Sequence, residues 1–184
     1  MSRKAKIIIR IICLIILAIA IVLLVKHYNK VQEQREHEKL MQQSIEEISY
    51  INKNSDMYGL KLMASPLEDF DAWGPNLLKN GKKTVGSYYC WEFNGKYCIN
   101  EVAIESWGGN VLGLHVGETY DKAMELMKER GYILKKEYEG RGENTRYVYK
   151  KAYVKIVFEV TPDNEIIEIF TKIYDPYNTQ MWIA

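Results

Sequence analysis

The sequence has few of the side chains that most often carry out chemistry in proteins. Three cysteines and three histidines occur among 184 residues. The histidines are His27, His37 and His115, and none is close in sequence to Cys90 or Cys98. Zinc sites need several cysteine, histidine or acidic ligands close together, and nucleophilic triads need histidine beside cysteine or serine. We therefore expect no catalytic site, no metal and no cofactor.

An excess of charge of either sign is also missing. The chain has 25 basic and 24 acidic residues and a formal net charge of +1. Nucleic-acid binding requires a basic surface, so we expect no nucleic-acid partner. A phosphate-binding loop is missing too, because the glycine pair in Trp107-Gly108-Gly109-Asn110 lacks the lysine and the strand-to-helix context of such a loop.

What the sequence does contain is a long apolar run near its start, residues 7–25. At about 1.5 Å per residue, a helix of this length spans roughly 28 Å, close to the hydrocarbon thickness of a bilayer. Arg3, Lys4 and Lys6 precede the run. The positive-inside rule then places residues 1–6 in the cytoplasm and everything after the anchor outside the membrane.

A cleaved signal peptide is the alternative interpretation of this run. Ala18-Ile19-Ala20 resembles a cleavage site after a basic start and an apolar stretch. Residues 21–25 continue the apolar run beyond those alanines, which favours an uncleaved anchor. Cys13 is not preceded by the small residues of a lipoprotein signal, and we expect it to face lipid.

Residues 26–55 contain no glycine or proline and predict a helical stalk. Met41, Ile45, Ile48 and Ile51 form one apolar stripe with spacings of four, three and three. Such a stripe suits packing on a domain or a short helical pair. A coiled coil needs three or four heptads, so self-association through the stalk is not favoured.

Residues 56–174 are long enough for one domain. Ser65-Pro66-Leu67-Glu68 predicts a short helix that ends at Gly74-Pro75, and residues 76–84 are expected to form a loop. A second helix should begin after Thr119 and end at Gly131. Strands are predicted as a hairpin over residues 88–104 and at 132–138, 146–150, 153–160 and 166–173.

The hairpin can adopt either of two registers. A two-residue Asn94-Gly95 turn would set Trp91 against Cys98, whereas a three-residue loop over residues 93–95 sets Cys90 against Cys98. Cross-strand pairs of similar side chains favour the second register. It allows a Cys90–Cys98 disulfide, although two reduced thiols remain the alternative. A bulge is expected near residues 100 and 101.

A helix, a glycine stop and a strand meander occur twice, over residues 59–106 and 113–174. The second copy contains LHVGETYDKA at 114–123, Gly131-Tyr132, YVKIVF at 153–158 and IIEI at 166–169. This order resembles the tandem repeat of β-lactamase-inhibitor-like domains and of the small outer-membrane lipoprotein (SmpA/OmlA) domains. The resemblance implies a two-layer α+β domain, with helices on one face of an antiparallel sheet and the other face free to bind a protein. The short first helix and the transmembrane anchor depart from the family.

Aromatic side chains are abundant, with fourteen tyrosines and four tryptophans. Such rings supply contact area at low entropic cost. A sheet covered on one side can bury only some of them, so others should face outward. We expect a binding face that contains Tyr88, Tyr147, Tyr149 and Tyr153.

The sequence therefore predicts a single-pass membrane protein, most typical of a bacterial cell envelope, whose outer domain binds another protein. One alternative is a structural or assembly subunit of a membrane complex, docked through the tail at residues 175–184, which includes Trp182 and Ile183. Another is a module that binds a peptide, a glycan or a lipid.

Overall fold

The computed structural model describes residues 3–93 and 95–174, with the side chains of residues 3–13 and 93 excepted. The chain divides into two compact units, Met1–Leu40 and the remainder from Met41 onward. The predicted tail at residues 175–184, with Trp182 and Ile183, lies outside the described residues, so its docking stays a prediction.

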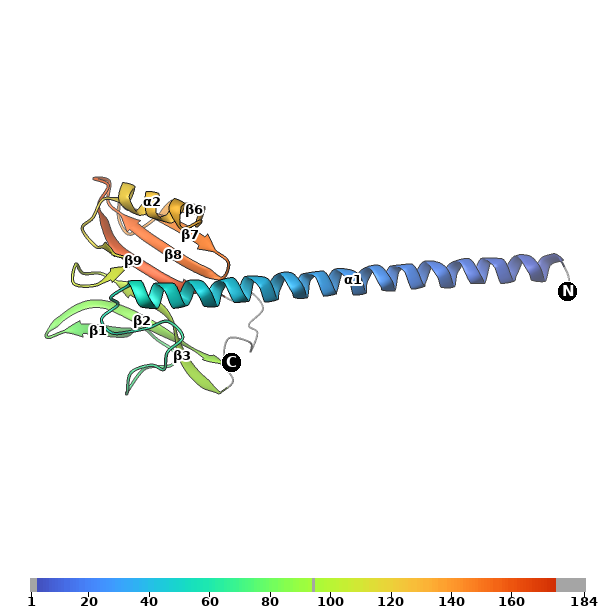
Figure 1. The fold of residues 1–184 in the computed structure, drawn as a ribbon, viewed down its shortest axis with the longest axis horizontal. Helices are drawn as coiled ribbons and strands as arrows, with labels where there is room; N and C mark the ends of the chain where they lie inside the picture. The colour runs from blue at the N-terminus through green and yellow to red at the C-terminus, as the bar shows by residue number, and fades with distance from the viewer. Residues whose placement is uncertain (1–2, 94, 175–184) are drawn as a thin grey trace. The chain divides into compact units, whose positions relative to one another are not determined.

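The first unit is the N-terminal part of helix α1, which extends from Arg3 to Asn54 (Figure 1). Every described side chain from Leu14 to Val25 is exposed. By length and composition this helix could cross a membrane. The run contains neither glycine nor proline, which is compatible with an uninterrupted helix.

The second unit is an α+β domain built on one antiparallel sheet. The order of its seven strands is β1-β2-β3-β9-β8-β7-β6. A short ribbon of β4 (Asn110–Val111) and β5 (Leu114–His115) precedes helix α2 (Tyr120–Glu129). The strands of the large sheet are β1 (Asn76–Asn80), β2 (Lys83–Phe93), β3 (Lys96–Ile104), β6 (Ile133–Glu139), β7 (Thr145–Lys151), β8 (Val154–Val160) and β9 (Ile166–Ile173).

Helices cover one face of this sheet, which we call the covered face. The ring centroid of Tyr120 on α2 lies 6.4 Å from that of Phe158 on β8. Phe158 pairs with Ile169 of β9, which pairs in turn with Ile104 of β3. Residues paired across antiparallel strands share a face, and all three are 0% exposed. The core therefore lies between the sheet and its helices.

The last turns of α1 belong to this core. Met41, Ile48 and Ile51 are buried, as the predicted stripe requires, but Ile45 is 43% exposed. Ser44 and Glu47 occupy the buried positions between them. The domain therefore begins near Met41 rather than at residue 56, and the predicted stalk contributes its final turns to it.

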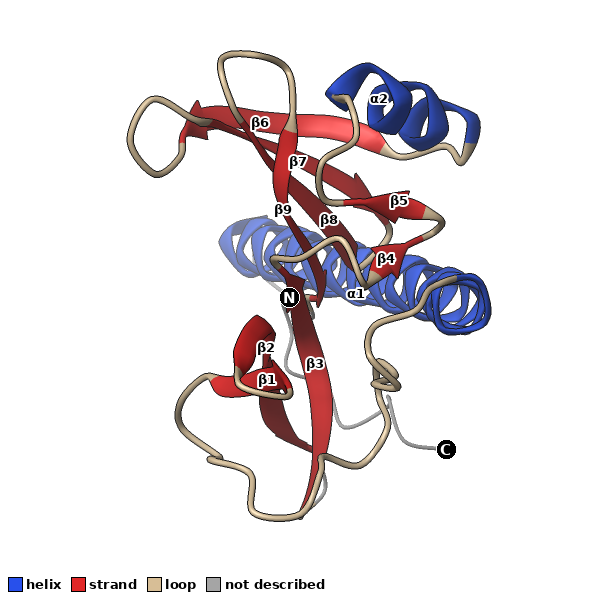
Figure 2. Ribbon diagram, turned by 90° about the vertical axis from the view of Figure 1, so that its left-hand side faces the viewer, coloured by secondary structure: helices blue, strands red, loops and turns tan. Residues whose placement is uncertain are grey.

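Helix α2 confirms the second predicted helix. Thr119 is its N-cap residue in an extended conformation, although its side chain makes no capping hydrogen bond. At the other end Gly131 adopts a positive φ of +75°. The N–H groups of Gly131 and Tyr132 donate to the carbonyl oxygens of Lys128 and Met127, at 3.1 and 2.8 Å. This is the Schellman arrangement that glycine favours at a helix end. Figure 2 shows α2 next to β6 and β7.

The prediction of a short helix that begins at Ser65-Pro66 and ends at Gly74-Pro75 is wrong. Residues 66–73 form turns and bends instead of a helix. Asp69 has a positive φ of +61°. The Asn76 side chain donates to the Asp71 carbonyl at 2.9 Å and accepts from the Asp71 N–H. These side-chain hydrogen bonds replace helical ones. The expected loop at 76–84 is likewise wrong, since it contains β1 and the start of β2.

The predicted hairpin is present, but its register is the one with the two-residue turn, which the pairing of similar side chains disfavoured. Residue 93 pairs with Lys96, so the turn has two residues, and Gly95 adopts a φ of +72°. Asn-Gly is the strongest short signal for such a turn. The turn chemistry therefore outweighs the pairing of similar side chains.

This register separates the two cysteines by one position. Cys90 pairs with Ile99 and Cys98 pairs with Trp91, so the predicted direct opposition of the cysteines is wrong. Both are free thiols in the structure. The predicted bulge is confirmed, because Tyr89 pairs with Glu101 and residue 100 is left over.

Candidate functional site: the open face of the sheet

The tyrosines predicted to form an outward binding face lie mostly in the core. Tyr88, Tyr149 and Tyr153 are 3%, 4% and 5% exposed, so the expectation that they face solvent is wrong. Tyr147 is half-buried, and its ring stacks on Tyr120 with the centroids 4.0 Å apart. The hydroxyls of Tyr120 and Tyr149 lie 2.7 Å apart. The contacts of Tyr120 with Tyr147 and Tyr149 hold α2 against the covered face.

The cysteines do not offer a nucleophile. Cys90 and Cys98 are both buried. Burial, followed by the proximity of Cys98, raises the pKa of Cys90 to about 11. Burial also raises the pKa of Cys98. Because the thiolate is the reactive form, both sulfur atoms are poorly reactive at neutral pH.

The opposite side of the sheet is the candidate site. Among the described residues of the second unit, neither α2 nor the last turns of α1 pack on it, and we call it the open face. Side chains alternate along each strand, so the residues between the core positions form this face. They lie in three rows that cross β7, β8 and β9: a lysine row of Lys150, Lys155 and Lys172; an apolar row of Val148, Val157 and Phe170; and a charged row of Arg146, Glu159 and Glu168.

The lysine row places like charges on neighbouring strands. Lys155 pairs directly with Lys150 on one side and with Lys172 on the other. Lys172 donates to Glu101 of β3 at 2.5 Å. Lys150 and Lys155 instead approach the ring of Tyr174, with Nζ atoms 4.9 and 3.9 Å from its centroid. Burial, followed by repulsion from Lys150 and Lys172, lowers the pKa of Lys155. Like charges directly opposite each other destabilise a sheet.

The apolar row forms the floor of a shallow groove. Val148, Val157 and Phe170 are each half-buried, and the guanidinium carbon of Arg146 lies 5.2 Å from the ring centroid of Phe170. Lys136 of β6 pairs with Val148. The groove has a volume of about 380 Å³, and its rim includes Lys136, Arg146, Lys155 and Lys172. A partner would meet an apolar strip bordered by positive charge.

The charged row closes one end of the open face. Burial alone would raise the pKa of Glu159, but hydrogen bonds from the Arg141 N–H, Arg146 and Asn144 hold it at about 2. Glu168 also pairs with Arg141, yet burial raises its pKa to about 7. Ion pairs of Arg141 with Glu159 and Glu168 hold the β6–β7 loop over the sheet, and Arg146 also pairs with Glu159. This row is therefore a structural cluster.

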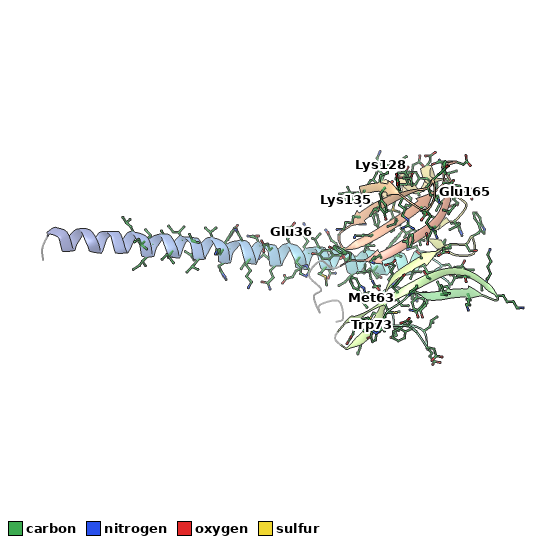
Figure 3. The ribbon with its side chains drawn as sticks, turned by 180° about the vertical axis from the view of Figure 1, so that it is seen from behind. Glu36, Met63, Trp73, Lys128, Lys135 and Glu165 are labelled. Carbon is green, nitrogen blue, oxygen red and sulfur yellow. The ribbon has the colours of Figure 1, made fainter. Side chains whose placement is uncertain are left out.

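A second groove of about 520 Å³ adjoins the first. Glu101 and Lys172 line both grooves, so their ion pair marks the boundary. Trp73, Tyr89 and Trp91 contribute aromatic rings to the second groove. Trp73 is 92% exposed and projects from the domain (Figure 3).

The bulge residue Asn100 supports this aromatic groove from below. Asn100 is 0% exposed. With its amide oriented to suit its neighbours, it donates to the Tyr89 carbonyl at 3.0 Å and accepts from Trp91 Nε1 at 3.2 Å. The Trp91 ring is thereby fixed by a buried hydrogen bond, which favours a preformed surface.

The open face was not predicted from the sequence, because the abundant aromatic rings pointed to other residues. The signal was present in the strands: Lys150, Lys155 and Lys172 alternate with core residues. Their alignment depends on the registers of β7, β8 and β9, which the strand sequences do not give.

No protein-family model, no curated protein and no solved structure matches this chain. The resemblance to β-lactamase-inhibitor-like and SmpA/OmlA domains stays a prediction.

Proposed function

We propose that this chain is a single-pass membrane protein that displays its α+β domain outside the membrane of a bacterial cell and binds another protein through the open face. The observation that carries the proposal is the groove over the apolar row. Three half-buried apolar side chains line it beside three aligned lysines, on a face that neither α2 nor the last turns of α1 cover.

The apolar run at residues 7–25 supports the membrane assignment. Its described side chains are exposed from Leu14 onward, and exposure of so much apolar surface to water is unfavourable. The basic residues before the run support a cytoplasmic N-terminus. A phosphatase fused after Ala184 should be active outside the membrane, and activity of a cytoplasmic reporter at that position would contradict this orientation.

A protein partner fits the open face better than a small molecule. Both grooves are shallow and adjoin each other, whereas small-molecule sites enclose most of their ligand. Protein interfaces combine aromatic anchors with a polar rim, as the second groove and the lysine row would provide.

A photocrosslinker tests this function in cells of the source organism. We would place p-benzoylphenylalanine at Val157, on the floor of the groove, in the full-length chain. The matched control carries it at Glu125, which is exposed on α2. We expect a discrete protein adduct from position 157 that is missing from position 125. The same adducts from both positions, or none from position 157, would contradict the proposal.

A further inference from the structure

The lysine row sets like charges directly opposite each other, which disfavours strand pairing, and contact of Lys150 and Lys155 with the Tyr174 ring offsets part of this repulsion. Lys150, Lys155 and Lys172 occupy one rung of three adjacent strands. Of the three, only Lys172 has a carboxylate partner among the described residues, namely Glu101. Burial and two like-charged neighbours lower the pKa of Lys155, which is the central lysine. A bound anion would relieve this repulsion.

The geometry of the rows limits the shape of such an anion. Neighbouring strands lie about 4.8 Å apart, so the three ammonium groups spread over roughly 10 Å. The apolar row lies two residues further along the strands, at a distance of roughly 7 Å. A complementary ligand therefore has several negative groups along one edge and apolar groups along the other.

We propose that the open face binds an extended acidic segment of a partner protein, with its carboxylates on the lysine row and its apolar side chains on Val148, Val157 and Phe170. This inference rests on the proposed protein-binding function and adds the chemistry of the partner. An extended chain places alternate side chains on one side, roughly 7 Å apart, and the long, flexible lysine and glutamate side chains can bridge the difference from the strand spacing of about 4.8 Å.

An anionic lipid satisfies the same geometry less well. One phosphate group cannot contact three ammonium groups spread over roughly 10 Å. The floor of the groove is open, whereas an acyl chain gains most of its binding energy from full burial. The structure therefore favours a peptide, and lipid binding becomes an outcome that the experiment must separate.

The test uses the full chain in zwitterionic phosphatidylcholine nanodiscs and a fluorescent probe peptide of sequence Glu-Val-Glu-Phe-Glu-Val-Glu. Fluorescence anisotropy should give saturable binding that weakens as salt rises. Lys155→Glu should weaken binding at least tenfold. The control Lys82→Glu makes the same charge change at an exposed position in the β1–β2 turn, and it should change affinity less than twofold.

Three results would overturn the proposal. The first is equal binding of a probe in which glutamine replaces every glutamate. The second is equal weakening by Lys155→Glu and Lys82→Glu. The third is Lys155-dependent binding to phosphatidylglycerol vesicles without binding to the peptide. If the position 157 adduct still forms in cells, the chemistry of the partner is wrong but the protein-binding function stands.

A stability measurement separates binding from a structural role. Lys155→Gln removes the central charge and should leave the melting temperature unchanged or raise it, because repulsion from Lys150 and Lys172 is lost. The same substitution should weaken binding of the acidic probe. A lowered melting temperature would mean that Lys155 stabilises the fold, and it would overturn the interpretation of the row as a binding device.

Discussion

Arg130, which follows α2, donates from one guanidinium nitrogen to both carboxylate oxygens of Glu47 on α1, at 2.8 and 2.9 Å. The same carboxylate accepts from the Tyr132 hydroxyl at 3.1 Å and from Lys151 at the end of β7. Glu47 is 4% exposed. Burial would raise its pKa, but the hydrogen bonds and charges of Lys151 and Arg130 outweigh that and lower it. One buried acid therefore joins α1, the end of α2 and the sheet.

Removing this acid should strongly destabilise the domain. Glu47→Ala leaves Arg130 and Lys151 without their shared acceptor, and we expect a loss of about 3 kcal/mol in the free energy of unfolding. Glu46→Ala is the matched control, because Glu46 is exposed and contacts only Gln42 in the described hydrogen bonds. Denaturant unfolding in detergent provides the measurement. Equal losses for both variants would show that the cluster adds nothing.

The contributions of Glu159 and Glu168 to the stability of the fold should depend on pH in opposite directions. The folded pKa of Glu159 is lowered to about 2, so its contribution to stability is complete above its unfolded pKa near 4.5 and is lost as pH falls toward 2. The folded pKa of Glu168 is raised to about 7. The folded state therefore binds more protons at Glu168 than the unfolded state between about 4.5 and 7, and stability falls as pH rises through that window.

The variants Glu168→Gln and Glu159→Gln measure this difference. The quantity compared is the free energy of unfolding of Glu168→Gln minus that of the unmodified protein. This difference should be roughly 2 kcal/mol larger at pH 8 than at pH 5. Glu159→Gln should destabilise at both pH values, because Glu159 is ionised throughout. Melting temperatures recorded from pH 5 to pH 8 give the comparison. A stability difference between Glu168→Gln and the unmodified protein that stays constant from pH 5 to pH 8 would refute the raised pKa.

The cysteines should remain reduced and protected. Their offset by one position opposes a disulfide within the observed register, and the raised pKa of each thiol disfavours the reactive thiolate. We expect iodoacetamide to alkylate Cys90 and Cys98 only after unfolding in denaturant. Intact mass without reductant is the check, because a disulfide would lower it by about 2 Da, the mass of the two hydrogens lost with the thiols.

Gly86 should tolerate no side chain. A Cβ atom at this position would lie 2.1 Å from the carbonyl oxygen of Ala103 on β3. Gly86→Ala must therefore separate β2 from β3, and we expect a loss of about 2 kcal/mol or more. Ser87→Ala on the neighbouring residue is the control and should change stability by less than about 0.5 kcal/mol. Similar melting temperatures for the two variants would contradict the close approach of the strands.

Much of the second half of the domain could be predicted from the sequence. Residues 113–173 combine a helix that ends at glycine with strands of clear alternation, and α2 and β6 to β9 appear within a few residues of their predicted positions. Local signals there agree with tertiary packing, and such agreement makes a prediction reliable.

The first half resisted prediction where local signals conflicted. Ser65-Pro66-Leu67-Glu68 carries the marks of a helix start, yet the side chains of Asp71 and Asn76 bond to the backbone nearby. The hairpin register depended on a choice between turn chemistry and side-chain pairing. Both errors arose where a few short-range hydrogen bonds decided between alternatives of similar free energy.

The candidate site was harder to predict because it depends on registers between strands far apart in sequence. The rung that aligns Lys150, Lys155 and Lys172 follows from the pairing of three strands. The tyrosines were misplaced for a related reason. The parity of Tyr147 and Tyr149 places them beneath α2, and the sequence did not show which face that helix would cover.

Ile51, near the end of α1, is 0% exposed, and its burial limits where a protease could release the domain from the proposed membrane anchor. A protease that cut after Asn54 would strip the domain of Met41, Ile48 and Ile51, all core side chains. The released fragment would expose the apolar surface that these residues cover and should aggregate. Shedding of a folded domain therefore requires cleavage before residue 41, within the polar stretch that begins at Lys26.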